Sequence, residues 1–445
     1  MGFASISLPC PYSLAVIAVL MGIALIDGSK ERVVVHPDRD LGGFKDFRGV
    51  NCGPLSPRGW DSSSLLDLSE FYARMGVRVI RFHDLCVADE LDTIFPDANA
   101  DPADLKSYNF ALLDRHVEKA LGVANLLILR VGYDIHRTPK NKPHVSMDKL
   151  VEVSKRIALH YTEGWADGYY YKNIWFEIWN EPDIEMFWAL SEEEYFALYE
   201  KVAKAIKSID LELKVGGPAI AYRFDFLDRF LDYARSQGAP VDFVTWHVYS
   251  TKPGDLAAKA QGVHEVMVKH GYGSAPSILD EWNYGDWQNP EPFEVFDTSK
   301  VAVFQMAAAL LMEDAPVDMA ALYRGDASVF GGLFRADGKP RKPFYAWLAY
   351  RELIEGKRRM AVEVAGRNLL ASASKGEDGS VRLLVVNYSK ERIAYELVAE
   401  GYKVDNVLAV DDQHELEPVE ACTGSACTIE PHAMQLALLR ESKQS

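Results

Sequence analysis

The chain has 445 residues, of which 48% are hydrophobic and 25% are charged, as is usual for a folded globular protein. This length exceeds what one compact core holds, so we expect a large domain and a smaller one. The formal net charge of -17 argues against nucleic acid, anionic lipid and polyanionic polysaccharide as partners, because these ligands need a surplus of Lys and Arg. A neutral ligand fits this composition better.

The first 28 residues contain an apolar run, residues 13–26, that Asp27 ends. This run is too short for a comfortable membrane span and is typical of a signal-peptide core. We therefore expect residues 1–28 to be a signal peptide or an anchor, and the protein to be secreted or held outside the cell. The alternative is a true start at Met21 and a cytoplasmic protein, since no Lys or Arg precedes the run.

Residues 45–355 alternate short β-rich runs with helical stretches. The expected strands are Phe47–Cys52, Val77–His83, Leu126–Tyr133, Ile174–Asn180, Lys214–Gly217, Phe243–Tyr249, Ser277–Glu281 and Met319–Tyr323. A helical stretch is expected after each, for example Leu65–Met75, Leu112–Leu121, Met147–Tyr161, Glu193–Ser208, Phe226–Ser236, Val301–Met312 and Phe344–Ile354. This repetition predicts an α/β fold, a (β/α)8 TIM barrel. A doubly wound open sheet is disfavoured because no Gly-rich phosphate motif follows the first strand.

Residues 356–445 change in character and predict a small antiparallel β-sandwich. Its expected strands are Met360–Val364, Leu369–Ser374, Val381–Asn387, Ile393–Val398, Val404–Val410 and Met434–Leu439. Residues 29–44 precede the barrel, and Arg32–Val35 within them could add a strand to this sandwich. Among five cysteines, Cys422 and Cys427 flank a short turn. Whether they form a disulfide or remain free thiols is left open by the sequence.

Polar residues gather where four of the predicted barrel strands end, which is where active sites of this fold lie. The second strand ends in Arg81-Phe-His83, the fourth in Trp179-Asn180-Glu181, the sixth in His247-Val-Tyr249 and the seventh in Glu281-Trp282. These clusters predict one site at the mouth of the barrel.

Glu181 and Glu281 are separated by 100 residues (281 − 181), which is about 33 residues for each of three β/α units. Strands four and seven of a closed barrel lie on opposite sides, so the two carboxyl groups should face each other. A retaining glycosidase needs two such groups about 5–5.5 Å apart, one protonated and one ionised. We expect Glu181 to be the general acid/base and Glu281 to be the nucleophile.

The runs Trp-Asn-Glu-Pro after the fourth strand and Asp-Glu-Trp-Asn at the seventh resemble clan A glycoside hydrolases. With Arg-Phe-His on the second strand and His-x-Tyr on the sixth, the barrel most resembles family 39. The resemblance implies that Asn180 hydrogen-bonds the sugar 2-hydroxyl, that Arg81 and Tyr249 orient the nucleophile, and that His247 shapes the subsite of the cleaved sugar.

The other candidate substrate contacts flank these residues. His83 is a further donor near Glu281, whereas Trp179 and Trp282 are candidate platforms for a sugar ring. Tyr323 ends the eighth strand, where the clan often has Trp. Glu177 is interpreted as a buried structural carboxylate that pairs with Arg81.

The sequence thus predicts a retaining glycoside hydrolase that cleaves a β-linked, neutral oligo- or polysaccharide. The alternatives are a non-catalytic carbohydrate-binding barrel and a transglycosylase that uses the same carboxylates. We expect no metal and no cofactor, because neither an H-E-x-x-H motif nor a barrel-end cluster of three histidines occurs. The expected partner is a carbohydrate, not nucleic acid or a membrane substrate, and the sequence does not define an oligomeric state.

Overall fold

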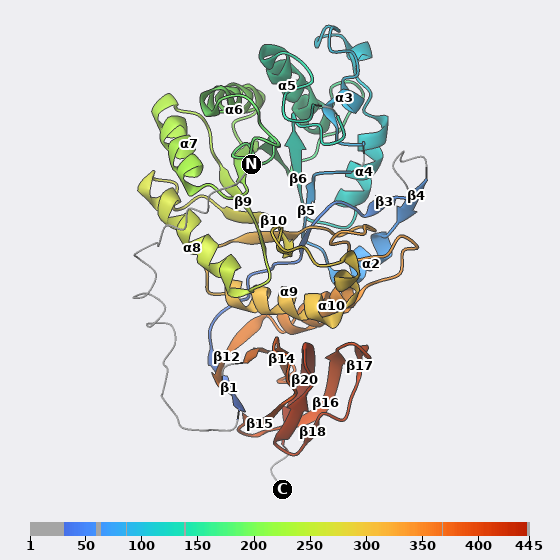
Figure 1. Ribbon diagram of the computed structural model, residues 1–445, viewed down its shortest axis with the longest axis vertical. Coiled ribbons are helices and arrows are strands. Elements are labelled where there is room, and N and C mark those ends of the chain that lie inside the picture. Colours follow the sequence, from blue (N-terminus) through green and yellow to red (C-terminus); the bar gives the residue numbers. More distant parts are fainter. Residues whose placement is uncertain (1–30, 59–63, 86, 138, 367, 443–445) are drawn as a thin grey trace.

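The computed structural model describes residues 31–58, 64–85, 87–137, 139–366 and 368–442. Its larger domain is a closed barrel of eight parallel strands (Figure 1). In barrel order the strands are β2 (Gly49–Asn51), β5 (Val79–Phe82), β6 (Leu126–Val131), β7 (Ile174–Ile178), β8 (Lys214–Ile220), β9 (Phe243–Ser250), β10 (Ser277–Tyr284) and β11 (Met319–Leu322). Each lies where a strand was predicted, and the TIM-barrel prediction is confirmed.

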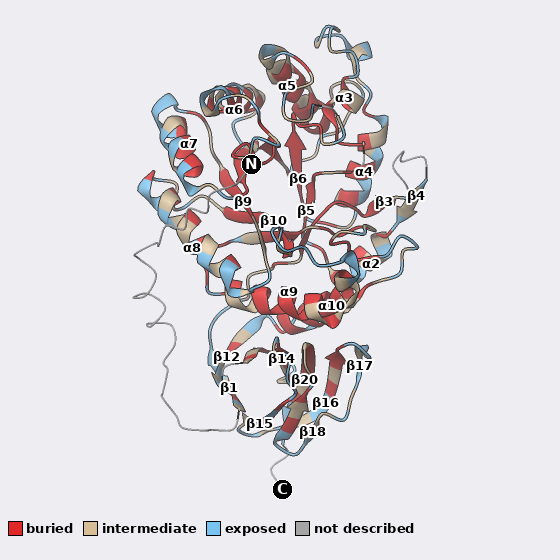
Figure 2. Cartoon of the chain, in the orientation of Figure 1, coloured by how far each residue is buried: buried red, intermediate tan, exposed pale blue. Residues whose placement is uncertain are grey.

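Helices follow the strands and surround the barrel. They are α2 (Ser69–Met75), α3 (Leu91–Ile94), α4 (Ala111–Leu121), α5 (Met147–Glu163), α6 (Glu192–Lys207), α7 (Phe224–Gln237), α8 (Gly254–Lys269), α9 (Ser299–Met312) and α10 (Lys342–Ile354). The strands and the inward faces of the helices are buried, whereas the outward faces of α7 and α8 are exposed (Figure 2).

The predicted helix Leu65–Met75 is wrong at its start. Leu65–Asp67 is strand β4, which pairs antiparallel with β3 (Leu55–Pro57). The Leu68 amide donates to the carbonyl of Pro54 at 2.9 Å, and the Asp67 carboxylate accepts from the Ser69 amide at 3.0 Å. These bonds end the hairpin and begin the helix at Ser69, so the helical pattern covers only the second half of the predicted range.

The smaller domain is a ten-stranded sheet in the order β17-β16-β20-β14-β13-β12-β1-β15-β19-β18. Its strands are β1 (Glu31–Asp40), β12 (Arg358–Ala365), β13 (Leu369–Lys375), β14 (Val381–Asn387), β15 (Ile393–Ala399), β16 (Tyr402–Val410), β17 (Glu415–Pro418), β18 (Cys422–Thr423), β19 (Ala426–Ile429) and β20 (Ala433–Glu441). Strand β1 contains the predicted segment Arg32–Val35 and joins β12 antiparallel and β15 parallel. Cys422 and Cys427 form a disulfide.

The sheet is open, with β17 and β18 at its edges, and it folds over its own core, while its outer face lies against the barrel. The Tyr395 hydroxyl on β15 donates to Gln435 Oε1 on β20 at 3.1 Å across the interior. Helices α9 and α10 lie between this sheet and the barrel (Figure 1), and nearly every residue of α9 is buried. An apolar helix without a polar face is expected where both sides are covered.

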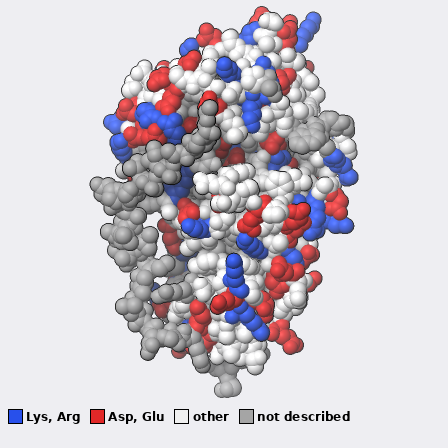
Figure 3. Space-filling model, viewed as in Figure 1, with Lys and Arg blue, Asp and Glu red and all other residues white. Residues whose placement is uncertain are grey.

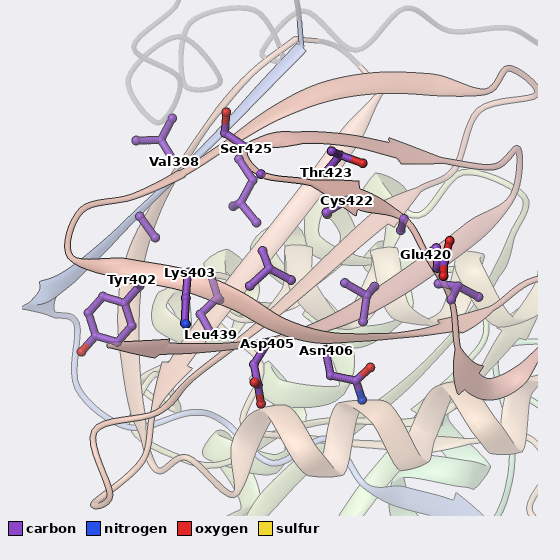
Figure 4. A pocket seen from close by; sticks show the side chains of 17 residues that line it. Val398, Tyr402, Lys403, Asp405, Asn406, Glu420, Cys422, Thr423, Ser425 and Leu439 are labelled. Carbon is purple, nitrogen blue, oxygen red and sulfur yellow. The ribbon is translucent and has the colours of Figure 1, made fainter. Parts of the chain in front are cut away.

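A cavity of about 810 Å³ lies in the smaller domain, beside β16 and β18 (Figure 4). None of the predicted site residues lines it. Among the described residues, no helix combines the length and the apolar character that crossing a membrane requires. The predicted signal segment, residues 1–28, lies outside the described part of the chain.

Candidate active site

Glu181 and Glu281 face each other at the carboxyl ends of the barrel strands. One carboxylate oxygen of each, together with a ring nitrogen of His247, forms a group whose atoms all lie within 4.8 Å of one another. Both residues are largely buried, with 8% and 7% of their surface exposed. The separation is compatible with the short distance that retaining glycosidases need.

Glu181 lies on a strained turn that follows β7. Trp179 has φ of 70° and Glu181 has φ of 45°, both in the left-handed region that non-glycine residues rarely adopt. The turn is held because the Trp179 amide donates to Val131 O at 3.0 Å and the Glu181 amide donates to Ala219 O at 3.1 Å. Strain of this kind persists only where the surroundings fix it, and it is frequent at functional sites.

Both oxygens of Glu281 accept hydrogen bonds. The Tyr249 hydroxyl donates to Oε1 at 2.8 Å, and Arg81 Nη1 donates to Oε2 at 2.9 Å. His83 Nε2 lies 3.9 Å from Oε2. Donors on both oxygens, one of them cationic, favour the ionised carboxylate that a nucleophile requires.

Arg81 is fully buried and connects three strands of the barrel. Its guanidinium donates to Glu177 Oε2 at 2.7 Å and to Asn180 Oδ1 at 2.8 Å, in addition to Glu281. The predicted pairing of Arg81 with Glu177 is therefore confirmed. The planar group makes these bonds in fixed directions, so it sets the positions of both carboxylates and of the amide.

Asn51 and Asp280 belong to the same network and were not predicted. Asn51 Oδ1 accepts from Arg81 at 3.2 Å, and Asp280 Oδ2 lies 3.0 Å from Arg81 Nε. In a regular strand Asp280 and Glu281 point to opposite faces. The pairing of β10 with β9 shifts register between Leu279 and Glu281, so both carboxylates reach the interior.

His247 connects the acid/base candidate to this network. Its Nδ1 lies 2.7 Å from Glu181 Oε1, and its Nε2 lies 3.4 Å from Asp280 Oδ1. Burial alone lowers the pKa of His247, but the charges of Glu281, Asp280 and Glu181 outweigh it and raise the pKa to about 10.

The pKa of Glu181 is raised, first by burial and then by the negative charges of Glu281 and Asp183. His247 opposes this shift through its hydrogen bond and its charge. A raised pKa keeps the carboxyl protonated nearer to neutral pH, as a general acid requires. The two carboxyls therefore have opposite surroundings, which is the pattern expected of an acid and a nucleophile.

His83, Tyr323 and Asp84 form one side of the site. Burial and the charge of Arg81 hold the pKa of His83 well below its usual value, so this ring is neutral. The Tyr323 hydroxyl donates to Asp84 Oδ2 at 2.9 Å, and Arg324 Nη1 donates to the same oxygen at 2.6 Å. Burial alone would raise the pKa of Asp84, but Arg324, His136 and Tyr323 lower it to about 2.

The comparisons with known proteins agree with this geometry. The model of the glycosyl hydrolases family 39 matches residues 32–294. The chain belongs to this family. It is 31% identical over 193 residues to a beta-xylosidase of Geobacillus stearothermophilus (40% of this chain, 38% of that protein). It is 26% identical over 295 residues to a beta-xylosidase of Caldicellulosiruptor saccharolyticus (61% and 57%). The matches thus span less than two thirds of either relative.

Solved structures show the same fold. A glucosidase from Croceicoccus marinus superposes with a TM-score of 0.77 at 24% identity, covering 93% of this chain and 100% of that one. A GH39 beta-xylosidase from Caulobacter crescentus superposes with a TM-score of 0.70 at 19% identity, covering 92% and 99%. These likenesses extend over the barrel and the smaller domain together.

The structure of this family 39 chain places two predicted sugar contacts elsewhere. Trp282 is fully buried and packs against Trp347 of α10, with ring centroids 6.2 Å apart. Trp179 is also fully buried, and its indole donates to Phe187 O at 3.0 Å. A ring without an exposed face cannot stack on a sugar. Trp282 follows the inward-facing Glu281, so strand alternation turns it towards the helices.

Trp287 is an accessible aromatic near the site that the predicted substrate contacts did not include. It is 56% exposed, and its ring lies 5.2 Å from that of Tyr249 and 5.2 Å from that of Phe330. It therefore offers a face close to Glu281 at the rim of this family 39 site. Its position six residues after Glu281, the end of the predicted seventh strand, in an aromatic run with Trp282 and Tyr284, was the signal available in the sequence.

Proposed function

We propose that this chain is a retaining β-glycosidase in which Glu181 is the general acid/base and Glu281 is the nucleophile. The observation that carries the proposal is the placement of two buried carboxyl groups within 4.8 Å of each other in opposite surroundings. Glu281 accepts from Tyr249 and Arg81, whereas burial raises the pKa of Glu181.

In the first step, the Glu281 carboxylate attacks the anomeric carbon, and the bond from that carbon to the leaving oxygen breaks. The proton of Glu181 passes to the leaving oxygen, so that an alcohol departs and a glycosyl ester of Glu281 remains. Because the negative charge of Glu281 helps to raise the pKa of Glu181, forming the ester removes this effect. Glu181 is then better suited to remain ionised.

In the second step, Glu181 accepts a proton from water while the water oxygen attacks the anomeric carbon. The ester bond breaks, Glu281 leaves as a carboxylate, and the sugar departs with its original configuration. Arg81 engages the amide oxygen of Asn180 at 2.8 Å. The amide nitrogen of Asn180 is therefore the atom that we propose donates to the sugar 2-hydroxyl.

The substrate that we propose is a neutral β-linked glycoside, with β-xylosides as the first to be tested. Two relatives are named beta-xylosidases, and the net charge of -17 disfavours polyanions. On the face drawn in Figure 3, Lys and Arg are interspersed with Asp and Glu rather than gathered into one basic area. Such a surface does not favour an anionic polymer.

The test compares Glu181→Gln and Glu281→Gln with Glu193→Gln, an exposed residue of α6. Aryl β-xylosides and β-glucosides are the substrates. Each catalytic variant should lose at least about a thousandfold in kcat and keep its circular dichroism spectrum, whereas the control stays active. Azide should restore turnover of Glu181→Ala and yield a β-glycosyl azide. Full activity of either Gln variant, or sugar binding without turnover by the natural protein, contradicts the proposal.

We further propose that the protein is exported. The apolar run of residues 13–26 and the Cys422–Cys427 disulfide support this, because disulfides persist mainly in oxidising compartments. The full chain, expressed in a bacterium that recognises its leader, should appear outside the cytoplasm. N-terminal sequencing of that fraction tests whether the leader is cleaved, and recovery only from the cytoplasm contradicts export.

A further inference from the structure

Three carboxylates gather beside the active site without taking part in it. Glu90 and Asp92 lie at the start of α3, in the insertion after β5 (residues 83–110, between β5 and α4), and Asp134 follows β6. One oxygen of each lies within 4.8 Å of those of the other two. Glu90 and Asp134 are each only 1% exposed, so this is not an ordinary solvated acidic surface.

Two oxygens in this cluster are buried and have no hydrogen-bond partner among the described residues. They are Glu90 Oε1 and Asp134 Oδ2. The other oxygen of each carboxylate accepts from a backbone amide, Glu90 Oε2 from His136 at 3.3 Å and Asp134 Oδ1 from Asp92 at 2.9 Å. A buried carboxylate oxygen without a donor is strongly unfavourable unless it is protonated or bound to a cation.

The neighbouring arginine donates no hydrogen bond to the two unpartnered oxygens, although its charge partly offsets theirs. Arg130 Nη2 donates to Asp89 Oδ2 at 2.8 Å, and its Nη1 donates to Tyr133 O at 2.6 Å. It is therefore already paired with a fourth carboxylate.

We propose that Glu90, Asp92 and Asp134 bind a calcium ion. Three carboxylates from two segments form an all-oxygen ligand set, and the group contains neither a thiolate nor an imidazole. Hard divalent cations prefer such a set, and Ca²⁺ accepts irregular geometry more readily than Mg²⁺, which keeps most of its water. The two unpartnered oxygens would then have a partner that carries enough charge.

The ion would join the insertion after β5 to the loop after β6. Tyr133 directly precedes Asp134, and its ring stacks on that of His83 with centroids 6.0 Å apart. His83 in turn lies 3.9 Å from Glu281. Calcium would therefore hold the wall of the active site from outside, and its main effect would be on stability.

The experiment uses the full chain after treatment with EDTA and desalting. Titration with CaCl2 in a calorimeter should give one site, and thermal unfolding in 1 mM CaCl2 should have a midpoint at least about 3 °C higher than in EDTA. MgCl2 at the same concentration should have a clearly smaller effect. An equal effect of the two salts, or no binding of calcium, overturns the assignment.

The variants Glu90→Gln and Asp134→Asn keep the shape of the side chains and remove one negative charge each. We expect both to lose the calcium-dependent shift. In EDTA both variants should have a midpoint of thermal unfolding no lower than that of the natural protein, because each has lost one of the mutually repelling negative charges. Asp97→Asn, an exposed position in the same insertion, is the matched control and should keep the shift. A shift that survives in both cluster variants, or disappears in the control, contradicts the proposal.

Discussion

His247 Nδ1 lies 2.7 Å from Oε1 of Glu181, at hydrogen-bond distance. The hydrogen bond and the positive charge of His247 lower the pKa of Glu181, against burial and the charge of Glu281, which raise it. Because the proposed first step needs protonated Glu181, we expect this pKa to set the alkaline limb of the pH profile.

Replacing His247 by Gln should therefore move the alkaline limb of kcat/KM to higher pH. The change removes a cation that favours ionised Glu181, so the proton is retained further into the alkaline range. The measurement is the pH dependence of hydrolysis of an aryl glycoside with a poor leaving group. A shift to lower pH, or a profile that does not move, would show that His247 does not act on Glu181 in this way.

Tyr249→Phe should lower kcat by about 100-fold with little change in the circular dichroism spectrum. The substitution removes one of the two donors to Glu281, the hydroxyl 2.8 Å from Oε1, and leaves Arg81 in place. Tyr170→Phe is the control, because Tyr170 is 72% exposed. Steady-state kinetics measure the effect, and unchanged kcat in Tyr249→Phe is the contrary result.

Arg81→Lys should destabilise the protein by about 3 kcal/mol and strongly reduce activity. Lysine keeps the charge but cannot donate in the fixed directions that reach Glu177, Asn180 and Glu281. Urea unfolding followed by fluorescence gives the change in the free energy of unfolding.

The control for this change is Arg223→Lys, which alters an arginine that pairs with Glu192 and Asp225 at the surface. It should cost less than about 1 kcal/mol, because exposed ion pairs are worth little. Equal effects of the two substitutions would mean that the buried network does not depend on the guanidinium.

The barrel could be predicted from sequence because short, largely apolar strands alternate with helical stretches eight times along the chain. The same order predicts that Glu181 and Glu281, three units apart, lie across the mouth. The buried position of Glu177 was predictable, because its side chain should point to the same side as that of Glu181 and lie deeper in the barrel.

What sequence reasoning missed depends on local irregularities. The register shift before Glu281 turns the Asp280 side chain towards the barrel interior, and no pattern of residues in the sequence predicts this shift. The hairpin of β3 and β4 depends on pairing between two three-residue strands, which is too little for a periodicity. The buried position of Trp282 could have been predicted, because strand alternation from Glu281 already directs its side chain outward. It was predicted as a sugar platform because it directly follows the candidate nucleophile in sequence.

The two tryptophans after Glu281 give the last prediction. Trp287 is 56% exposed beside Tyr249, so Trp287→Ala should raise KM roughly tenfold while the midpoint of thermal unfolding stays the same. Trp282 is fully buried against Trp347, so Trp282→Phe should cost roughly 2 kcal/mol of stability and leave KM near its natural value. Kinetics and unfolding of both variants, measured together, separate the two roles. The contrary result is a raised KM in Trp282→Phe with an unchanged KM in Trp287→Ala. It would mean that the sugar contacts Trp282, the residue that the structure buries in the core.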